Sequence, residues 1–493
     1  MQKDLSKIIV NITSTLRDVL VALDKNALGV VFIVDDEQIM RGILTDGDIR
    51  RALLKGARVT DPAATYMNRD FISGSTRNEK TENLALMKEN IRNVPILNDS
   101  GQVVDILLWT DFWRLPVMEP VLKGKEAEYV LDCLATNWIS SQGKYVERFQ
   151  DAFTEYHSVA YALCVSNGTA ALHLAMAALG IGRDDEIIVP DLTFAAPASM
   201  AVLCGAKPVL VDVDRTTWTI DPVAIEARIT PRTKAIVPVH LYGHPCDMDP
   251  IMEIAKKHSL HVIEDCAEAL GAEYKGCKVG TIGDIGTFSF YANKVITTGE
   301  GGMVTTNNIK LHHRMQLLRD HGMTRERRYW HHAAGFNYRL TNLQAAVGLA
   351  QMERIDEFLG YREEIVARYG RQLKDIKGIT LPPSKKWAKN IYWLYSIIID
   401  DKETGICRDA LMTQLAGQGI DTRPFFYPLH QQPPFISEAD RNFPNSDWLA
   451  SAGLCLPTSN NIKLEDVDKV CAAIHSVIQS ESLFRKYSGK ATG

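Results

Sequence analysis

The 493-residue sequence lacks features that mark several large classes of protein. Lys and Arg number 55 against 60 Asp and Glu, so the formal net charge is −5. The chain therefore has no overall basic field of the kind that nucleic-acid-binding proteins use. The longest apolar stretch, residues 194–206, is shorter than the roughly 20 residues that a membrane-spanning helix needs. We expect neither nucleic acid nor a membrane among its partners.

The nine cysteines are scattered along the chain and include no C-x-x-C pair. This spacing indicates neither a zinc site nor a disulfide framework, and we predict no metal. Residues 1–16 contain no long apolar segment of the kind found in secretory signals. We therefore expect a reduced, cytoplasmic protein. Its 46% hydrophobic and 23% charged residues are typical of a folded chain, and its length suggests two to four domains.

Residues 1–120 contain an internal repeat with an offset of 63 positions. Val31–Val34 corresponds to Val94–Leu97, and Gly42-Ile43-Leu44 corresponds to Asp105-Ile106-Leu107. A repeat that keeps its register without gaps indicates two copies of one small α/β unit. We place the end of this first domain near residue 120, after a segment that contains two prolines.

The two copies resemble a pair of CBS domains, the modules first recognised in cystathionine β-synthase. That family uses a G-h-x-T-x-x-D pattern to hold the ribose of an adenine nucleotide, which the resemblance places at Thr45 and Asp48. In the second copy Leu108 replaces the Thr, although Asp111 is retained. The resemblance implies an adenine nucleotide at Thr45 and Asp48, with Asp111 as a second candidate. The alternative is that Asp48 only caps a helix beginning near Ile49.

Beyond residue 120, predicted strands and helices alternate. The expected strands are residues 162–165, 186–189, 207–213, 234–239, 261–264, 286–290 and 302–305. This alternation indicates a largely parallel sheet covered by helices on both faces. A helix over residues 355–373 and a strand within 392–399 indicate a smaller α/β lobe. We therefore expect a large domain over residues 121–353 and a small C-terminal domain over 354–493.

Chemically useful side chains follow several of these strands. The strand at 286–290 leads to Lys294, which places an amine at the carboxyl edge of the sheet, where α/β proteins bind ligands. Another strand is followed by Asp265, whose carboxylate can keep the nitrogen of a pyridine ring protonated. Gly168 and Thr169 begin a helix, where backbone N–H groups and a hydroxyl favour a phosphate.

Together these motifs resemble the sugar aminotransferases that depend on pyridoxal phosphate (PLP), over roughly residues 121–480. The similarity lies in residues 138–143, 168–173, 190–195, 264–269, 286–302, 335–340 and 423–430. It implies an aspartate-aminotransferase-like α/β fold (fold type I of the PLP enzymes), with a mostly parallel central sheet and a small C-terminal α/β lobe. The α/β CBS pair precedes this fold in the chain.

The resemblance implies how PLP is held. Lys294 would bind it covalently and act as general base, Asp265 would pair with the ring nitrogen, and Phe194 would stack on the ring. Glu268 stands where many members have Gln near the phenolic oxygen of PLP. A carboxylate there opposes the phenolate unless it is protonated or turned away, so the sequence leaves its role open.

Further residues are implied around the phosphate and the substrate. Gly168, Thr169 and Ser289 would hold the phosphate of PLP, and Asn337 would reach it from a neighbouring subunit. This implies a homodimer or a higher homo-oligomer. Candidates for contacts with the substrate are Arg339, Tyr427 and His430. The alternative for these three is that they only brace the segment around the cofactor.

The reaction implied is transfer of an amino group from glutamate to a nucleotide-linked keto-sugar. Related sugar dehydratases carry His at the position of Lys294, so the lysine favours transamination. Residues 264–304 most resemble GDP-perosamine synthases, which aminate carbon four of GDP-4-keto-6-deoxymannose for surface polysaccharides such as O-antigen. One alternative substrate is a UDP- or GDP-linked 4-keto-6-deoxy N-acetylhexosamine, as in legionaminic-acid biosynthesis. An alternative of another class is a catalytically inert regulator or scaffold.

Overall fold

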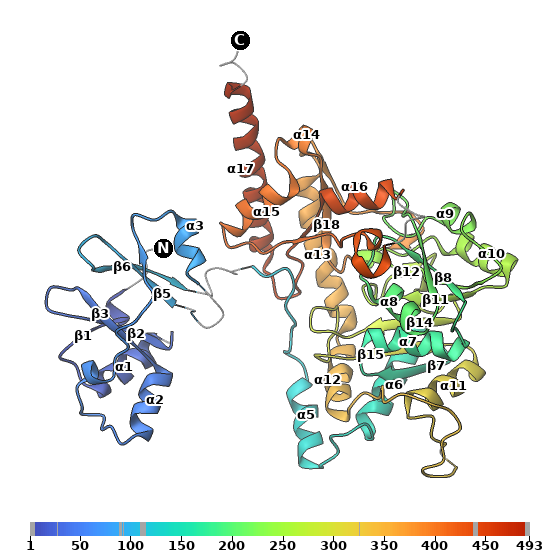
Figure 1. Ribbon diagram of the computed structural model, residues 1–493, viewed down its shortest axis with the longest axis horizontal. Coiled ribbons are helices and arrows are strands. Elements are labelled where there is room, and N and C mark those ends of the chain that lie inside the picture. The colour runs from blue at the N-terminus through green and yellow to red at the C-terminus, as the bar shows by residue number, and fades with distance from the viewer. Residues whose placement is uncertain are drawn as a thin grey trace. The chain divides into compact units, whose positions relative to one another are not determined.

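The computed structural model describes residues 5–26, 28–87, 91, 93–108, 115–324, 326–436 and 442–488. The chain divides into two compact units, Met1–Arg114 and Leu115–Gly493. In Figure 1 the first unit is blue, and the second runs from cyan to red. Each unit has hydrophobic clusters of its own. Among the described residues, no helix combines the length and apolarity that crossing a bilayer requires.

The first unit contains two three-stranded sheets with the same layout. Their strands are β1 (Ile9–Asn11), β2 (Val30–Val34) and β3 (Met40–Thr45), then β4 (Gly74–Ser75), β5 (Asn93–Leu97) and β6 (Val103–Leu108). In each sheet the first pair is parallel and the second antiparallel. Strands β5 and β6 begin and end 63 residues after β2 and β3. The structure therefore confirms two copies of one α/β unit.

Apolar side chains on both faces of β2 hold this unit together. Helix α1 (Leu16–Asn26) buries Leu16, Val19 and Leu23 against one face, at the i, i+3, i+7 spacing of an amphipathic helix. On the other face, Phe32 packs in a cluster with Ile106 of the second sheet. Strand β2 thus joins the two copies, since all five of its residues are buried.

The helix expected near Ile49 begins three residues earlier, as α2 (Asp46–Leu54). Thr45 is its N-cap, and its hydroxyl accepts a hydrogen bond from the N–H of Asp48 at 3.2 Å. The Asp48 carboxylate in turn accepts from the N–H and O–H of Thr45, at 2.9 and 2.7 Å. Asp48 is therefore part of a capping box and is not the cap itself. Asp111 lies outside the described residues.

The second unit is built on a seven-stranded sheet with the order β7-β15-β14-β11-β10-β8-β9. Along the sheet these strands are β7 (Tyr161–Val165), β15 (Gly302–Thr306), β14 (Ile285–Ser289), β11 (His261–Asp265), β10 (Thr233–Ile236), β8 (Glu186–Pro190) and β9 (Lys207–Val211). Strand β15 runs antiparallel to both of its neighbours, and the other neighbouring pairs are parallel. The mostly parallel sheet is confirmed, with strand ends within three residues of those expected.

Both faces of this sheet are covered, because alternate residues of a strand enter different hydrophobic clusters. In β7, Leu163 and Val165 pack with residues of α7 (Gly168–Leu179), whereas Cys164 packs with residues of α6 (Lys144–His157). The other helices here are α5 (Glu126–Ala135), α8 (Ala196–Leu203), α9 (Pro222–Glu226), α10 (Met248–His258), α11 (Ile309–Arg319) and α12 (Asn342–Met352). A small sheet of β12 (Glu273–Tyr274), β13 (Cys277–Lys278) and β17 (Ala388–Lys389) lies outside the main one.

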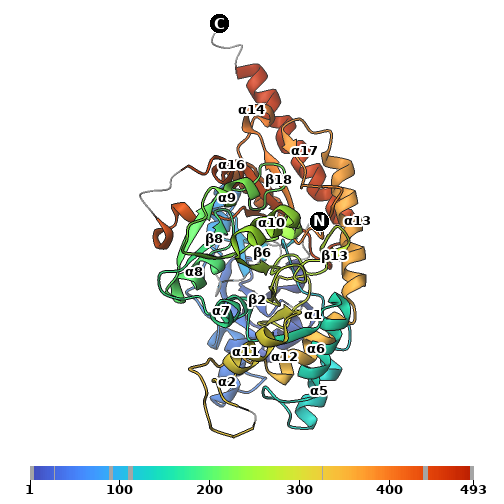
Figure 2. The same cartoon turned by 90° about the vertical axis from the view of Figure 1, so that its right-hand side faces the viewer.

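The C-terminal part adds an antiparallel sheet with the order β16-β18-β20-β19. Its elements are α13 (Ile355–Leu373), β16 (Ile379–Thr380), β18 (Tyr395–Ile399), α14 (Asp401–Thr404), α15 (Arg408–Ala416), β19 (Arg423–Pro424), α16 (Pro444–Ala452), β20 (Gly453–Leu456) and α17 (Leu464–Ser488). Helices α13 and α17 lie side by side (Figures 1 and 2). The strand expected within 392–399 starts at Tyr395, because Tyr392 has a left-handed φ of 47°.

Candidate active site

The ends of three strands bring the candidate residues to one edge of the large sheet. Strands β7, β11 and β14 run in the same direction, so their carboxyl ends lie on the same side. Asp265 is the last residue of β11 and Ser289 is the last of β14. Gly302 of β15 pairs with both Ser289 and Val165. Because α7 begins three residues after Val165, its start lies near Ser289.

Lys294 follows β14 and its amine is buried. The side chain is 14% exposed, and Nζ lies 4.0 Å from Oε1 of Glu268. The same nitrogen lies 3.7 Å from the ring centre of Trp393. Burial lowers the pKa of Lys294, and the negative charges of Glu268 and Asp265 oppose this effect. A lowered pKa increases the neutral fraction of the amine, which is the form that attacks a carbonyl.

Two buried carboxyl groups face this amine. Burial raises the pKa of Glu268 to about 7, and Lys294 is the first of the groups that oppose the rise. The Glu268 carboxyl also accepts a hydrogen bond from the backbone N–H of Tyr242 at 2.8 Å. Burial likewise raises the pKa of Asp265, against the N–H of Ala267 and the charge of Lys294. An amine and two carboxyls with shifted pKa values, set at a sheet edge, are typical of an active site.

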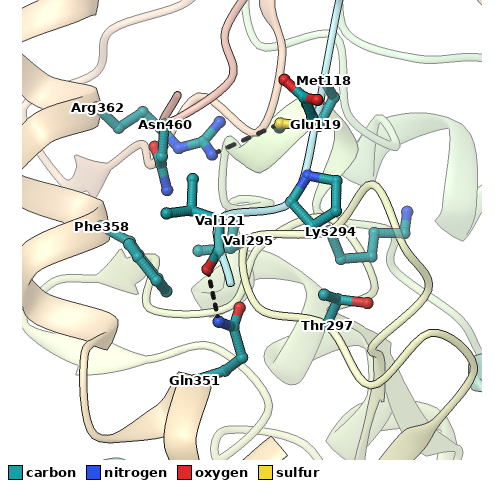
Figure 3. Close-up of a pocket in the computed structure, with 11 residues that line it drawn as sticks. Met118, Glu119, Val121, Lys294, Val295, Thr297, Gln351, Phe358, Arg362 and Asn460 are labelled. Carbon is teal, nitrogen blue, oxygen red and sulfur yellow. Dashed lines mark hydrogen bonds between the residues drawn. The ribbon is translucent and has the colours of Figure 1, made fainter. Parts of the chain in front are cut away.

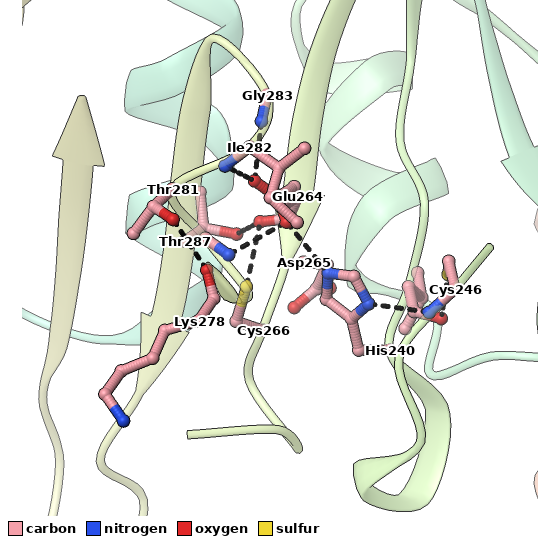
Figure 4. A network of polar contacts seen from close by, with 12 residues as sticks. His240, Cys246, Glu264, Asp265, Cys266, Lys278, Thr281, Ile282, Gly283 and Thr287 are labelled. Carbon is pink, nitrogen blue, oxygen red and sulfur yellow. Dashed lines mark hydrogen bonds and ion pairs between the residues drawn. The ribbon is translucent and has the colours of Figure 1, made fainter. Parts of the chain in front are cut away.

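A third carboxylate, one residue before Asp265, anchors the neighbouring loop (Figure 4). Glu264 is fully buried and accepts hydrogen bonds from backbone N–H groups of Gly280, Ile282 and Gly283, at 2.7 to 2.8 Å. His240 Nδ1 accepts from the N–H of Cys246 at 2.9 Å, so its Nε2 carries the hydrogen and donates to Glu264 at 3.1 Å. This network is not among the features predicted from the sequence. Two consecutive carboxylates at the end of a buried strand were its sequence signal.

The donor atoms of His240, Glu264 and Cys266 lie within 4.8 Å of one another. Such a group resembles a metal site in its composition. Here, however, the His240 nitrogens and the Glu264 oxygens are already used in the hydrogen bonds just described. The cluster therefore acts as a brace for the strand that ends in Asp265.

The start of α7 forms a cradle for an anion. Asn167 caps the helix by accepting from the N–H of Ala170 at 2.7 Å, and the first N–H groups of a helix have no partner within it. A Cβ on Gly168 would lie only 2.8 Å from the Cβ of Ser289, so only glycine allows this close approach. Thr169 is exposed beside it. The cradle combines helix N–H groups with two hydroxyls, which suits a phosphate.

Phe194 lies in the segment after β8 and presents an uncovered aromatic ring, with 58% of the residue exposed. Its ring centre is 6.0 Å from that of Phe426, which stacks on Tyr242 at 5.4 Å. Tyr242 in turn binds Glu268 through its N–H. This chain of contacts connects Phe194 with the buried carboxyls. Tyr427, beside Phe426, is 67% exposed.

Asn337 and Arg339 lie on the segment before α12. The Arg339 guanidinium contacts Asp320 at 2.8 Å and donates to Oδ1 of Asn337 at 3.0 Å. The segment joins the end of β7, because the Ser166 N–H donates to the carbonyl of Tyr338 at 2.8 Å. Asn337 is exposed. None of these contacts reaches Lys294, so within one chain the two residues are not brought together with the amine.

His430 is a structural partner of a buried aspartate. Its backbone N–H and Nδ1 contact the two carboxylate oxygens of Asp191, at 2.8 and 2.7 Å. Its ring stacks on Phe443 at 4.8 Å. Asp191 follows β8 and is fully buried; burial raises its pKa, and the bonds to His430 oppose this rise. These contacts favour the bracing role that the sequence left open for His430.

Replacing His430 should therefore affect stability first. We expect His430→Ala to reduce the free energy of unfolding by about 1–3 kcal/mol, because it removes the imidazole hydrogen bond to the buried Asp191 carboxylate. Denaturant unfolding followed by fluorescence measures this loss. Tyr427→Phe, at an exposed side chain, serves as control with a change within about 0.5 kcal/mol. An unchanged stability of His430→Ala, together with a large rise in the KM for a substrate, would contradict the bracing role.

Residues 120–475 match the DegT/DnrJ/EryC1/StrS aminotransferase family, and residues 1–55 match the CBS domain family. The GDP-perosamine synthase of Caulobacter vibrioides is 48% identical over 370 residues, which cover 75% of this chain and 100% of that protein. The GDP-perosamine synthase of Escherichia coli O157:H7 is 46% identical over 361 residues, 73% of this chain and 98% of that protein.

A solved structure with a similar fold is Helicobacter pylori PseC, an aminotransferase involved in the biosynthesis of pseudoaminic acid. It matches with a TM-score of 0.70 and 31% identity, over 74% of this chain and 99% of that chain. The matched part of this chain is about as long as the second unit, Leu115–Gly493.

Proposed function

This chain belongs to the DegT/DnrJ/EryC1/StrS aminotransferase family, and on that basis we propose that it transfers an amino group from glutamate to carbon four of GDP-4-keto-6-deoxymannose, giving GDP-perosamine. The chain is a PLP-dependent transaminase. We place its product in the biosynthesis of a surface polysaccharide such as O-antigen, and the enzyme in the cytoplasm. The observation that carries the proposal is the largely buried Lys294 amine, on which the buried carboxyls of Glu268 and Asp265 both act, at the sheet edge.

The residues present fit PLP. The cradle of Gly168, Thr169 and Ser289 suits its phosphate, because helix N–H groups and hydroxyls converge where a Cβ would not fit. Asp265 would keep the ring nitrogen protonated. When bound, PLP supplies a ring that accepts electrons from the carbon next to the transferred nitrogen. Phe194 offers a flat apolar face for stacking on that ring.

Lys294 has two roles in this proposal. Its neutral Nζ would hold PLP covalently. As a free amine it would act as general base for the proton on the α-carbon of glutamate. In the second half it would act as general acid and supply the proton that carbon four of the sugar gains. Burial assists both roles, because it lowers the pKa of Lys294.

We propose a role for Glu268 that is supported by its raised pKa. A carboxyl with a pKa of about 7 is protonated below pH 7 and can then donate a hydrogen bond to the phenolic oxygen of PLP. Its other oxygen is held by the N–H of Tyr242. Protonation thus removes the conflict between a carboxylate and a phenolate.

We further propose that the enzyme works as a homodimer or a higher homo-oligomer. The contacts of Asn337 within its own chain do not lead to Lys294, and its side chain is exposed. An exposed amide next to Arg339 is suited to reach the phosphate in a neighbouring subunit. The two exposed aromatic residues Phe194 and Tyr427 would then be covered by cofactor, substrate or partner chain.

We predict that Lys294→Ala keeps the fold and loses at least about 1000-fold in turnover, because both covalent binding and proton transfer depend on this amine. The assay supplies glutamate with GDP-, UDP- and dTDP-linked keto-sugars and detects the amino-sugar by mass spectrometry. In the parent, borohydride reduction followed by peptide mapping should label Lys294. Product from an N-acetylhexosamine but not from the GDP-linked sugar would indicate the legionaminic-acid type. A parent that binds no PLP would indicate an inert scaffold.

The state of Glu268 predicts a pH dependence of PLP affinity. As pH rises through about 7, the parent carboxyl gains a negative charge facing the phenolate, so its affinity should fall by up to about tenfold per pH unit. Glu268→Gln keeps an acceptor for the Tyr242 N–H and carries no charge, so the same fall should be absent. Absorbance titrations of PLP between pH 6 and 8.5 compare the two proteins. Parallel curves for parent and variant would refute the role given to Glu268.

We also propose that the CBS unit binds an adenine nucleotide beside Asp48. A cleft of about 340 Å³ adjoins this residue and is lined by Arg51, Lys55 and Tyr66 as well. The Asp48 carboxylate faces Arg51 at 2.6 Å at the edge of the cleft. Two basic side chains and one aromatic ring match the phosphates and the base of a nucleotide, and the carboxylate matches its ribose hydroxyls.

A matched pair of variants tests this nucleotide site. Thr15 and Asp18 form the same capping contacts at α1 that Thr45 and Asp48 form at α2, with O–H to carboxylate distances of 2.7 Å in both. We expect Asp48→Asn to weaken binding of AMP or ATP about tenfold or more in calorimetry, since it removes a charged acceptor. Asp18→Asn should change stability similarly and leave nucleotide binding unchanged. Absence of binding heat in the parent would refute the site.

A further inference from the structure

Trp393 makes two contacts with the segment that carries Lys294. The Lys294 Nζ lies 3.7 Å from the centre of the Trp393 ring. The indole N–H donates to the carbonyl oxygen of Asn293 at 2.7 Å. Trp393 is 4% exposed, so its ring forms a buried wall next to the amine. One side chain thus contacts both the reactive atom and the backbone immediately before it.

Arg362 holds Trp393 in place from α13. Its guanidinium donates to the carbonyl oxygens of Tyr392 and Trp393, at 3.1 and 2.7 Å. Arg362 is 1% exposed, and burial lowers its pKa to about 9, which leaves it positively charged at neutral pH. These bonds fix the backbone that carries the indole. The ring therefore has little freedom to move away from Lys294.

The space behind Lys294 offers its amine no other position. The stem of Lys294 borders a cavity of about 10 Å³, lined also by Arg362, Phe358 and Gln351, which has room for a single water molecule. Figure 3 shows the amine of Lys294 directed away from this cavity. The cationic Arg362 on its far side would also repel an ammonium group. In the structure the amine lies close to Glu268 and over the ring of Trp393.

Three groups then determine the charge of the free amine. Glu268 and Asp265 are the charged groups that act on Lys294 in the structure, and both favour its ammonium form. The face of an indole ring favours the same form, because its π-electrons attract a cation. Without the ring, fewer groups would oppose the lowering of the Lys294 pKa by burial.

We propose that Trp393 is a positioning residue for Lys294, whose ring holds the amine beside Glu268 whenever it is not bonded to PLP and whose N–H fixes the preceding carbonyl. This inference rests on the proposed function, because the lysine is released from PLP in each half of a transamination. In those intervals a flexible lysine must stay within reach of the carbon atoms between which it moves a proton.

The test measures how fast the PLP-free protein captures PLP as a function of pH. In this step Nζ forms a bond to the aldehyde carbon and water leaves, so only the neutral amine reacts and the rate rises with pH. Removing the ring destabilises the ammonium form. We expect the midpoint of the rise to fall by about one pH unit in Trp393→Leu. Trp393→Phe keeps a smaller ring and loses the N–H, so its midpoint should fall less, with a capture rate about threefold lower at high pH.

The controls separate this inference from the proposed function. Lys294→Ala should capture no PLP covalently, and a parent protein that captures none would refute the proposed function itself. A parent that captures PLP while Trp393→Leu has the same midpoint and rate would overturn the positioning role alone. Circular dichroism checks that Trp393→Leu is folded. If it is not, Trp393→Phe decides the matter, because a curve identical to that of the parent equally overturns the proposal.

Discussion

The burial of one amine beside two carboxyl groups is the constraint on which the rest of the site depends. Burial disfavours every charged form, so it lowers the pKa of Lys294 and raises those of Asp265 and Glu268. The opposite charges, 4.0 Å apart for Lys294 and Glu268, act against these shifts. The shifts move the pKa of the amine down and those of the carboxyls up, which favours proton exchange among these groups in both directions.

This balance is maintained by a rigid support behind the sheet edge. Successive residues of a strand point to opposite faces, so Asp265 and the preceding Glu264 serve different purposes. Glu264 is saturated by His240 and by three backbone N–H groups of the loop before β14. The loop is thereby fixed at the start of the strand that leads to Lys294. A wholly buried carboxylate is tolerated here because each of its oxygens is hydrogen-bonded.

The N-terminal unit is built differently, from two copies of one small α/β motif. The two sheets share strand pairing, a 63-residue offset and a bulge at the same position, after Ile33 and Ile96. The Thr and Asp of the capping box at α2 come from the first copy, whereas Leu108 takes the place of Thr45 in the second. The copies therefore share their strand pairing, whereas the hydroxyl that caps α2 in the first copy has no counterpart at position 108 of the second.

The sequence alone determined those features that follow from local patterns of residues along the chain. The gapless repeat predicted two similar sheets, and alternating segments predicted a mostly parallel sheet; both are present. Only the tertiary structure decided that His430 contacts Asp191, that His240 contacts Glu264 and that Trp393 covers Lys294. These pairs are far apart in the chain, so no local pattern records them. Their contacts form only once the chain has folded and buried these side chains together.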